Sequence, residues 1–303
     1  MSTIAVADGD IAAWCRRHLG SEPAEVLFTM SHLSSVTGLV LRDGRQVVLK
    51  IRPMAPRLAA CAAVHRHLFA AGFPCPQPLA GPHPLGGYAA GAELLVPGGD
   101  LIVDSPAPAQ AHAEVLADLI ARAPAADAIG SLAPAPPWTA WDHGYPGLWP
   151  PADDRLDDLN SEPSWLDDVA REVRWLLDGT SGPAVIGHGD FEAQNLRWSG
   201  ATPLAVHDWD SVICAPEPIV VGLAAAVWPA GITSASATVD ETAAFLDAYQ
   251  AARGAAWSAG EVGAAWAAGL WVLAFNAKKA SFDGYATLDH TEADERLHRA
   301  AVH

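Results

Sequence analysis

The chain has 303 residues, half of them apolar, which is enough to bury two substantial cores. Its 18 basic side chains stand against 35 acidic ones, so the formal net charge is −17. This balance argues against nucleic acid or an anionic membrane as a partner. It is compatible with a cationic small molecule, although many proteins are acidic for solubility alone.

The cysteines and apolar stretches favour a cytoplasmic protein. Four cysteines occur in the chain: Cys15, Cys61, Cys75 and Cys214. They form no Cys-x-x-Cys pair, so neither a zinc site nor a disulfide framework is indicated, and the composition fits a reducing cytosol. The first ten residues lack a basic, apolar leader, and the apolar stretches 219–230 and 262–275 fall short of the roughly 20 residues of a membrane span.

The N-terminal hundred residues are predicted to be rich in β-structure. A helix over 10–19 ends at Gly20, and a short strand is expected over 26–30. The polar stretch SHLSSVTG at 31–38 comes next. An Asp-Gly turn then joins two β-rich runs in a hairpin, and the pattern at 87–96 indicates another hairpin.

Lys50 lies between Leu49 and Ile51 near the end of a predicted strand. An ammonium group in an apolar strand needs a partner, and nucleotide phosphates would be one. An edge-strand lysine that reaches water is the alternative. In the first case the stretch 31–38 would cover the phosphates, with hydroxyls and amides from residues that include Ser35 and Thr37.

Several helices and one long irregular segment follow. Helices are predicted over 57–71, 105–122 and 165–178, and Pro97-Gly98-Gly99 is a plausible hinge between residues 1–97 and 98–303. Capping boxes at Thr238 and Ser258 open further helices. The segment 123–164 is rich in proline, tryptophan and aspartate. It is interpreted either as a substrate-facing wall for an amine-bearing sugar or as a packed insertion.

The chemistry of the chain is concentrated at 185–210, VIGHGDFEAQNLRWSGATPLAVHDWD, between two apolar runs that read as strand ends. Carboxylate and amide oxygens suit Mg²⁺ beside a phosphate-bearing substrate. Phosphoryl transfer needs such a metal, a carboxylate near the attacking hydroxyl and a cation on the phosphates. Asn195 and Asp208 are the candidate metal ligands, and Asp190 is the candidate to orient the hydroxyl and receive its proton.

HGDFEAQN followed by HDWD resembles the catalytic and metal motifs of the aminoglycoside phosphotransferase family, which shares the protein-kinase-like fold. The resemblance implies an α+β, bilobal architecture. Its N-lobe, 1–97, would be a small antiparallel sheet that binds the nucleotide, and its C-lobe, 98–303, would be mainly helical and bind the acceptor. The implied activity is ATP-dependent, Mg²⁺-assisted phosphorylation of a hydroxyl on a small molecule. That molecule would be cationic or polyhydroxylated, such as an aminoglycoside or an amino-sugar-like compound.

The resemblance also implies individual roles. Lys50 would contact the nucleotide phosphates, and the segment 93–96 would contact adenine. The residues carried over for adenine are Glu93, Leu95 and Val96, the supporting or metal-side candidates are His188 and Asp210, and the acceptor-side candidates are Trp271 and Asn276.

One departure from the family pattern keeps rival interpretations open. The helix after Lys50 usually carries a glutamate that pairs with this lysine, but the alignment places Cys61 there, and no acidic residue occurs between Lys50 and Glu93. Either another carboxylate, such as Asp208, holds Lys50, or the protein binds nucleotide without catalysis. A second rival is a metal-dependent phosphohydrolase that uses His188, Asp190, His207 and Asp208. Neither the acceptor nor the oligomeric state follows from the sequence.

Overall fold

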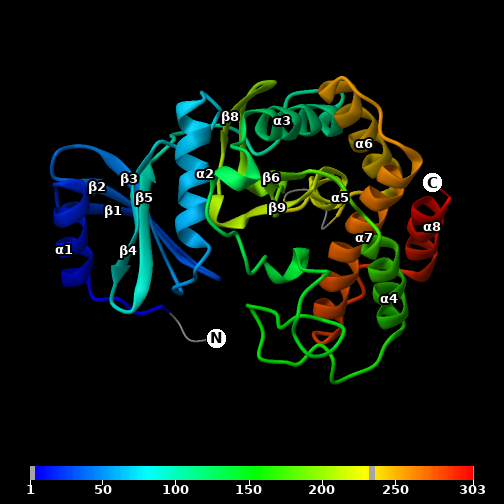
Figure 1. Ribbon diagram of the computed structural model, residues 1–303. Helices are drawn as coiled ribbons and strands as arrows, with labels where there is room; N and C mark the ends of the chain where they lie inside the picture. Colours follow the sequence, from blue (N-terminus) through cyan, green and yellow to red (C-terminus); the bar gives the residue numbers. More distant parts are fainter. Residues whose placement is uncertain (1–3, 232–235, 303) are drawn as a thin grey trace.

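A five-stranded antiparallel sheet forms the N-lobe of the computed structural model, which describes residues 4–231 and 236–302. The strand order is β1-β2-β3-β5-β4. The strands are β1 Pro23–Ser31, β2 Ser35–Leu41, β3 Gln46–Arg52, β4 Pro78–Leu85 and β5 Tyr88–Leu94. Helix α1, Asp8–Leu19, covers one end of this lobe, and α2, Leu58–Ala70, lies between the sheet and the C-lobe (Figure 1).

The alternation of side chains along β3 gives the two faces of the sheet different roles. Val47, Leu49 and Ile51 are buried in one apolar cluster with Trp14 of α1. Because successive strand residues point to opposite faces, Lys50 and Arg52 project from the other face. The N-lobe core therefore holds in place a strand that presents two cations on the side away from α1.

The prediction of a hairpin within residues 87–96 is wrong. Residues 88–94 form a single strand, β5, and its hairpin partner is β4, which the sequence reading missed. Pro78, Pro82 and Pro84 lie within β4 and argue against a strand, because proline cannot donate to a ladder. β4 tolerates these prolines because it is an edge strand.

The C-lobe is mainly helical, as expected. Its helices are α3 Pro108–Arg122, α4 Trp165–Asp178, α5 Glu217–Val227, α6 Val239–Arg253, α7 Ala259–Ser281 and α8 His290–Ala301. Both predicted capping boxes are confirmed at the starts of α6 and α7. Helices α5 and α7 cross closely at Gly222, where a Cβ atom would lie 2.0 Å from the carbonyl oxygen of Ala265. Only glycine permits this approach.

Two short antiparallel pairs complete the C-lobe. Strand β6, Ala184–His188, pairs with β9, Val212–Pro216, and β7, Leu196–Ser199, pairs with β8, Thr202–Val206. Short 3₁₀ turns, Ala193–Asn195 and Trp209–Ser211, lie between these strands. The predicted lobe boundary at residue 97 falls in the connection between β5 and α3 and remains a prediction.

The segment 123–164 is a packed insertion with two further 3₁₀ turns, Ala126–Ala128 and Pro137–Thr139. Trp149 is 1% exposed and stacks on Trp271 of α7 at a ring-centroid distance of 5.5 Å. Its indole nitrogen donates to Asp167 at 2.8 Å. Because Trp271 is fully buried in this contact, we assign it to the core and not to an acceptor pocket.

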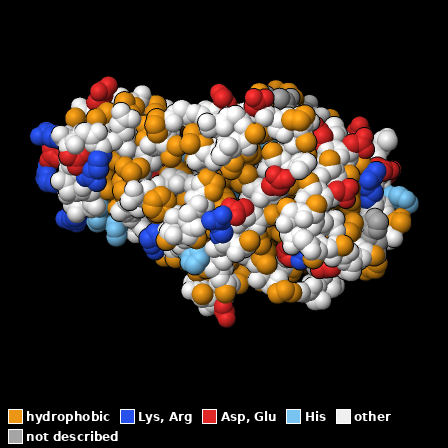
Figure 2. Space-filling model, turned by 90° about the horizontal axis from the view of Figure 1, so that it is seen from above, with side chains coloured by type: hydrophobic (Ala, Val, Ile, Leu, Met, Phe, Trp, Pro, Cys, Tyr) orange, Lys and Arg blue, Asp and Glu red, His pale blue; other side chains and the backbone are white. Residues whose placement is uncertain are grey.

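No helix in the described parts of the chain is long and apolar enough to cross a membrane. Figure 2 shows charged side chains of both signs on the surface, with basic ones gathered at the end of the molecule that the N-lobe forms.

Candidate active site

The pairing of β6 with β9 and of β7 with β8 brings 188–195 beside 207–211. The ladder places His188 opposite Val212, and the Gly189 amide donates to the Ser211 carbonyl at 2.7 Å. A Cβ atom on Gly189 would lie 2.8 Å from the Ile213 side chain and 3.0 Å from the Ser211 carbonyl oxygen. This close approach requires glycine before Asp190.

His188 is fully buried and binds the backbone of both segments. Its Nε2 lies 2.9 Å from the His207 carbonyl oxygen, and its Nδ1 accepts from the Asp190 amide at 3.2 Å. These contacts require the tautomer with the proton on Nε2. Both ring nitrogens are therefore engaged, which leaves neither of them free to bind a metal ion.

Asn195 orients Asp190. Its amide nitrogen donates to the Asp190 carbonyl oxygen at 2.9 Å and to the Asp190 carboxylate at 2.8 Å. Its Oδ1 atom accepts no hydrogen bond from any residue that the structure describes. Burial, together with the neighbouring charge of Asp208, raises the pKa of Asp190, whereas His188, Asn195 and Lys50 oppose this shift.

Lys50 contacts two carboxylates. It forms an ion pair with Asp208, and its Nζ atom lies 2.7 Å from Asp210. The open question of what replaces the missing glutamate is thus answered for this structure: Asp208 and Asp210 hold Lys50, while Cys61 is buried on α2. Arg52, two residues beyond Lys50, forms an ion pair with the other oxygen of Asp210.

Asp208 has an unusual backbone conformation. Its φ of 63° is in the left-handed region, and no other non-glycine residue in the described segments has a positive φ. A non-glycine residue there costs on the order of 1–3 kcal/mol and requires support from its surroundings. Burial alone would raise the pKa of Asp208, but the charge and hydrogen bond of Lys50 outweigh it and hold this pKa at about 2.

Asp208 and Asp210 do not lie on one continuing strand. Strand β8 ends at Val206, and Asp210 lies in the 3₁₀ turn Trp209–Ser211. The left-handed residue and this turn nevertheless bring both carboxylates to Lys50.

The oxygen donors fit a hard cation. Among described residues, no group of three His, Cys, Asp or Glu side chains is arranged to hold a metal ion. The amide oxygen of Asn195 and the carboxylate of Asp208 are both oxygen donors. Such donors suit Mg²⁺, which binds few protein ligands beside phosphates. The two-metal phosphohydrolase would need His188 as a ligand, and the engaged ring of His188 argues against it.

The register of the N-lobe sheet corrects one nucleotide expectation. Ser35 lies opposite Ile51 and Thr37 lies opposite Leu49, so both side chains are on the sheet face away from Lys50. Their hydroxyls do not face the Lys50 ammonium group. The backbone amides of this segment remain candidates to cover phosphates at that face.

The segment predicted to contact adenine, 93–96, begins in the last two residues of β5 and continues beyond it. The Leu95 amide already donates to the Gln46 carbonyl at 3.0 Å, and the Glu93 carboxylate lies 3.8 Å from the His207 ring. Within the described ranges, the Val96 backbone has no comparable hydrogen bond. Val96 is thus the member of this set whose polar backbone groups are open to a ligand.

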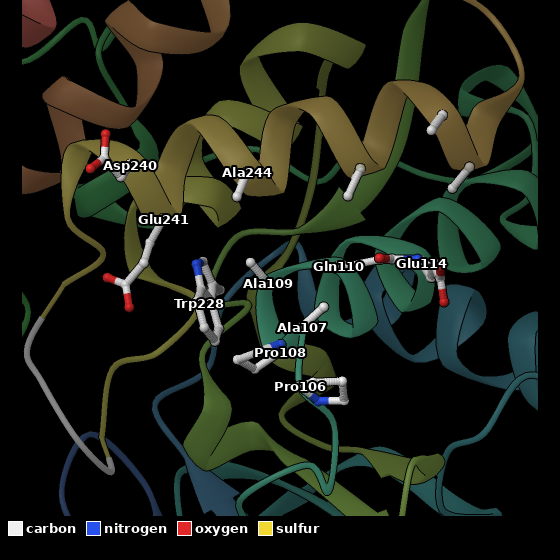
Figure 3. A pocket seen from close by; sticks show the side chains of 13 residues that line it. Pro106, Ala107, Pro108, Ala109, Gln110, Glu114, Trp228, Asp240, Glu241 and Ala244 are labelled. Atoms are coloured by element: carbon white, nitrogen blue, oxygen red, sulfur yellow. Dashed lines mark hydrogen bonds between the residues drawn. The ribbon is translucent and has the colours of Figure 1, made fainter.

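One cavity lies between helices of the C-lobe, and another lies where the C-lobe meets the β1–β2 turn. The larger, about 820 Å³, is between α3 and α6 and is lined by Trp228 and mainly small apolar residues (Figure 3). None of the predicted site residues lines it. The smaller, about 480 Å³, contains Asn276 of α7 and His32 of the β1–β2 turn.

Charged residues of this smaller cavity form pairs. Lys279 pairs with Asp154, and Arg155 pairs with Asp283 at 2.5 Å. These residues come from the insertion and from the region of α7, and the insertion also contacts the site, because the Trp138 indole donates to the Gly189 carbonyl at 2.7 Å. Segment 123–164 therefore both packs as an insertion and borders a cavity.

The sequence reading missed several of these residues. Arg52 could have been found, since it shares a strand face with Lys50. Glu192 lies within the motif itself, and burial, with the charge of Asp190, raises its pKa to about 8. The sequence marked segment 123–164 only as a whole, and the contacts of Trp138 with Gly189 and of Arg155 with Asp283 could not be predicted, because these partners are distant in the chain.

The fold and the convergence of these groups define a kinase-like protein with a site suited to phosphoryl transfer. A model of the phosphotransferase enzyme family (APH) matches residues 33–262. The chain belongs to this family and is a phosphotransferase whose acceptor group is an alcohol. No curated protein matches the sequence.

Solved structures share the fold at low identity. A protein from Ralstonia eutropha JMP134, provisionally named an aminoglycoside phosphotransferase, has 16% identity and a TM-score of 0.56, with 98% of this chain and 95% of that chain covered. A provisional fructosamine-3-kinase from Thermobifida fusca has 18% identity, a TM-score of 0.54 and coverages of 98% and 100%. An amicoumacin kinase solved with AMP-PNP and Ca²⁺ has 10% identity, a TM-score of 0.60 and coverages of 92% and 88%.

Proposed function

We propose that this phosphotransferase uses ATP and Mg²⁺ to phosphorylate a hydroxyl of a small polyhydroxylated molecule. The observation that carries the proposal is the convergence of Asp190, Asn195, Asp208 and Lys50, joined by the Asn195–Asp190 hydrogen bond of 2.8 Å and the Lys50–Asp208 ion pair. The amicoumacin kinase of the same fold was solved with an ATP analogue and a divalent cation, which supports both cofactors.

Each residue has a distinct task in this proposal. Asp190, fixed by Asn195, orients the acceptor hydroxyl and takes its proton, and burial, which raises the pKa of its carboxylate, makes it a stronger base. Lys50 neutralises charge on the nucleotide phosphates. Asn195 and Asp208 hold the metal ion, and the chemistry that Mg²⁺ supplies when bound is neutralisation of charge on the phosphate oxygens. His188 keeps the two loops together.

The nucleotide and the acceptor are assigned to different parts of the chain. We place the nucleotide against residues 1–97, with adenine near Glu93, Leu95 and Val96, where the Val96 backbone supplies the hydrogen bonds. The acceptor is bound by 98–303, in the 480 Å³ cavity that Asn276 lines. The proposed place of action is the cytoplasm, as the cysteine pattern suggested.

The cavity supports an acceptor recognised through hydroxyl groups. Aminoglycosides and amino sugars are the first compounds to test, as the family resemblance suggested. The pairing of Asp154 and Asp283 with basic residues leaves few free carboxylates for amines, which supports acceptors of low positive charge within that class. Whether the role is antibiotic resistance or metabolism follows from which acceptor is used.

The test is an acceptor screen with ATP and Mg²⁺, read as ADP formed above the hydrolysis seen without acceptor. We expect turnover with at least one polyhydroxylated compound. Nucleotide binding without turnover for any acceptor would instead support the non-catalytic alternative, which Cys61 at the glutamate position motivates.

A further inference from the structure

Helix α2 contacts the loop after Asp208 without offering a partner to Lys50. The Cys61 thiol lies 3.6 Å from the Asp210 carbonyl oxygen. Arg57, at the start of α2, donates to the Val212 carbonyl. Both contacts go to backbone atoms. The helix that usually carries the pairing glutamate therefore supports the loop but leaves Lys50 to find its carboxylates elsewhere.

Strand β3 supplies a second cation beside Lys50. Lys50 and Arg52 lie on the same face of this strand, and Asp210 lies between them. One Asp210 oxygen is 2.7 Å from the Lys50 ammonium group, and the other pairs with the Arg52 guanidinium group. The side chain of Lys50 is 22% exposed, that of Arg52 is 15% exposed and that of Asp210 is 25% exposed. Solvent therefore screens these contacts only in part.

The charges around Asp208 explain why Asp210 needs Arg52. Asp190 and Glu192 are also close to Asp208, and the charge of Asp208 contributes to raising the pKa of each. Without Arg52, only Lys50, which Asp208 shares, would balance the charge of Asp210, and repulsion would rise in the segment where Asp208 already holds a left-handed φ of 63°. Arg52 neutralises Asp210 and ties it to a strand that the N-lobe core fixes.

We propose that Arg52 is a positioning residue: through Asp210 it holds Lys50 and the Asp208 loop in place, a task that the helix glutamate absent at Cys61 would otherwise share. The inference rests on the proposed function for the roles of Lys50 and Asp208. It assigns Asp210 to this clamp and not to the metal ion. If Asp208 held a cation instead of Lys50, Asp210 would remain as the partner of Lys50.

The test compares Arg52→Met, Arg52→Lys and the surface control Arg66→Met in the full chain. Amide hydrogen exchange is measured over 208–213 without nucleotide, and the Kd for ADP is measured with and without Mg²⁺. Since removing one partner of a shielded charge pair is costly, we expect Arg52→Met to speed exchange over 208–213 and to weaken Mg²⁺-dependent ADP binding by at least about tenfold. Arg52→Lys keeps the charge, so it should retain most of the wild-type exchange protection and ADP affinity. Arg66→Met should change neither the exchange rates nor the ADP affinity.

A double-mutant cycle separates the clamp from a general loss of structure. Asp210→Asn alone should match Arg52→Met, and adding it to Arg52→Met should change little more, because the two residues act as one unit. In steady-state kinetics, Arg52→Met should raise the KM for ATP by a larger factor than it lowers kcat. If Arg52→Met does not fold, Arg52→Lys and Asp210→Asn carry the same comparison, with melting temperatures as the check on folding.

Equal exchange rates and equal ADP affinities in Arg52→Met and Arg66→Met would overturn the proposal, as would additive effects of Arg52→Met and Asp210→Asn. None of these binding and exchange measurements requires an acceptor. If the wild-type chain phosphorylates nothing while Arg52→Met still loosens 208–213, the proposed function fails and the clamp stands. If turnover is found but Arg52→Met leaves exchange over 208–213 unchanged, the clamp fails and the proposed function stands.

Discussion

At the residue scale, turnover depends most on Asp190, which Asn195 orients and His188 supports. Asp190→Ala removes the group that positions the acceptor hydroxyl and receives its proton, so kcat should fall by about 10²–10⁴-fold. Nucleotide affinity should hold, because Asp190 contacts no phosphate in the proposed arrangement. The rate of ADP formation checks the fall in kcat, and calorimetric Kd values check the nucleotide affinity. Asp178→Ala, at an exposed residue, is the control. Near-normal turnover of Asp190→Ala would refute the assignment.

Trp138 gives a second prediction at this scale, since its indole nitrogen donates to the carbonyl of Gly189, next to Asp190. Trp138→Phe keeps most of the ring but removes this donor. A single hydrogen bond contributes about 0.5–1.5 kcal/mol, so kcat should fall roughly 2- to 12-fold at an unchanged KM for ATP. Trp175→Phe is the matched control, because Trp175 is 76% exposed on α4. Identical kcat values for the two variants would show that the insertion does not position the loop.

At the element scale, His112 joins α3 to β7 and to the segment after α5. Its ring lies 5.0 Å from that of Trp198 and 4.9 Å from that of Trp228, and its Nδ1 bonds the Pro108 carbonyl at 2.8 Å. Burial lowers the pKa of His112 to about 4, although the bond to Pro108 opposes this shift. The folded state thus keeps His112 neutral where the unfolded chain begins to protonate it.

This shift predicts a pH-dependent loss of stability. Between pH 6.5 and about 4 the unfolded chain binds more protons at this residue, so the free energy of unfolding should decrease as the pH falls, by up to about 3 kcal/mol from His112. His112→Gln should show a shallower decrease over this range in denaturant titrations. The exposed His67→Gln should keep the wild-type slope. An unchanged slope in His112→Gln would remove His112 as the cause.

At the scale of the whole molecule, the net charge of −17 contrasts with the paired charges of the proposed acceptor cavity. Lys279→Met frees Asp154, which should lower the KM of a polyamine acceptor several-fold through a new contact with an ammonium group, while a neutral polyol keeps its KM. Arg299→Met, which breaks an ion pair on α8, is the matched control. A change in KM of equal size for both acceptors would argue against charge selection in this cavity.

Local patterns in the sequence identified most of the elements and the central motif. Periodic apolar residues and capping signals marked α4, α6 and α7, because these depend on neighbours within a few residues. The spacing of Asp190, Asn195 and Asp208 indicated phosphoryl transfer for the same reason: the ligands come from one short segment. β4 was missed because the edge position that tolerates its prolines is a property of the sheet and not of the strand.

The sequence by itself determined the family, the reaction class and the candidate loop, since motif spacing and side-chain periodicity are properties of the chain read in order. The tertiary structure alone decided which groups meet. Lys50 pairs with Asp208, and Arg52 pairs with Asp210, across more than half the chain length. Sheet register turned the Ser35 and Thr37 side chains away from Lys50. Contacts between distant segments depend on how the lobes and strands pack together, and no local pattern encodes that geometry.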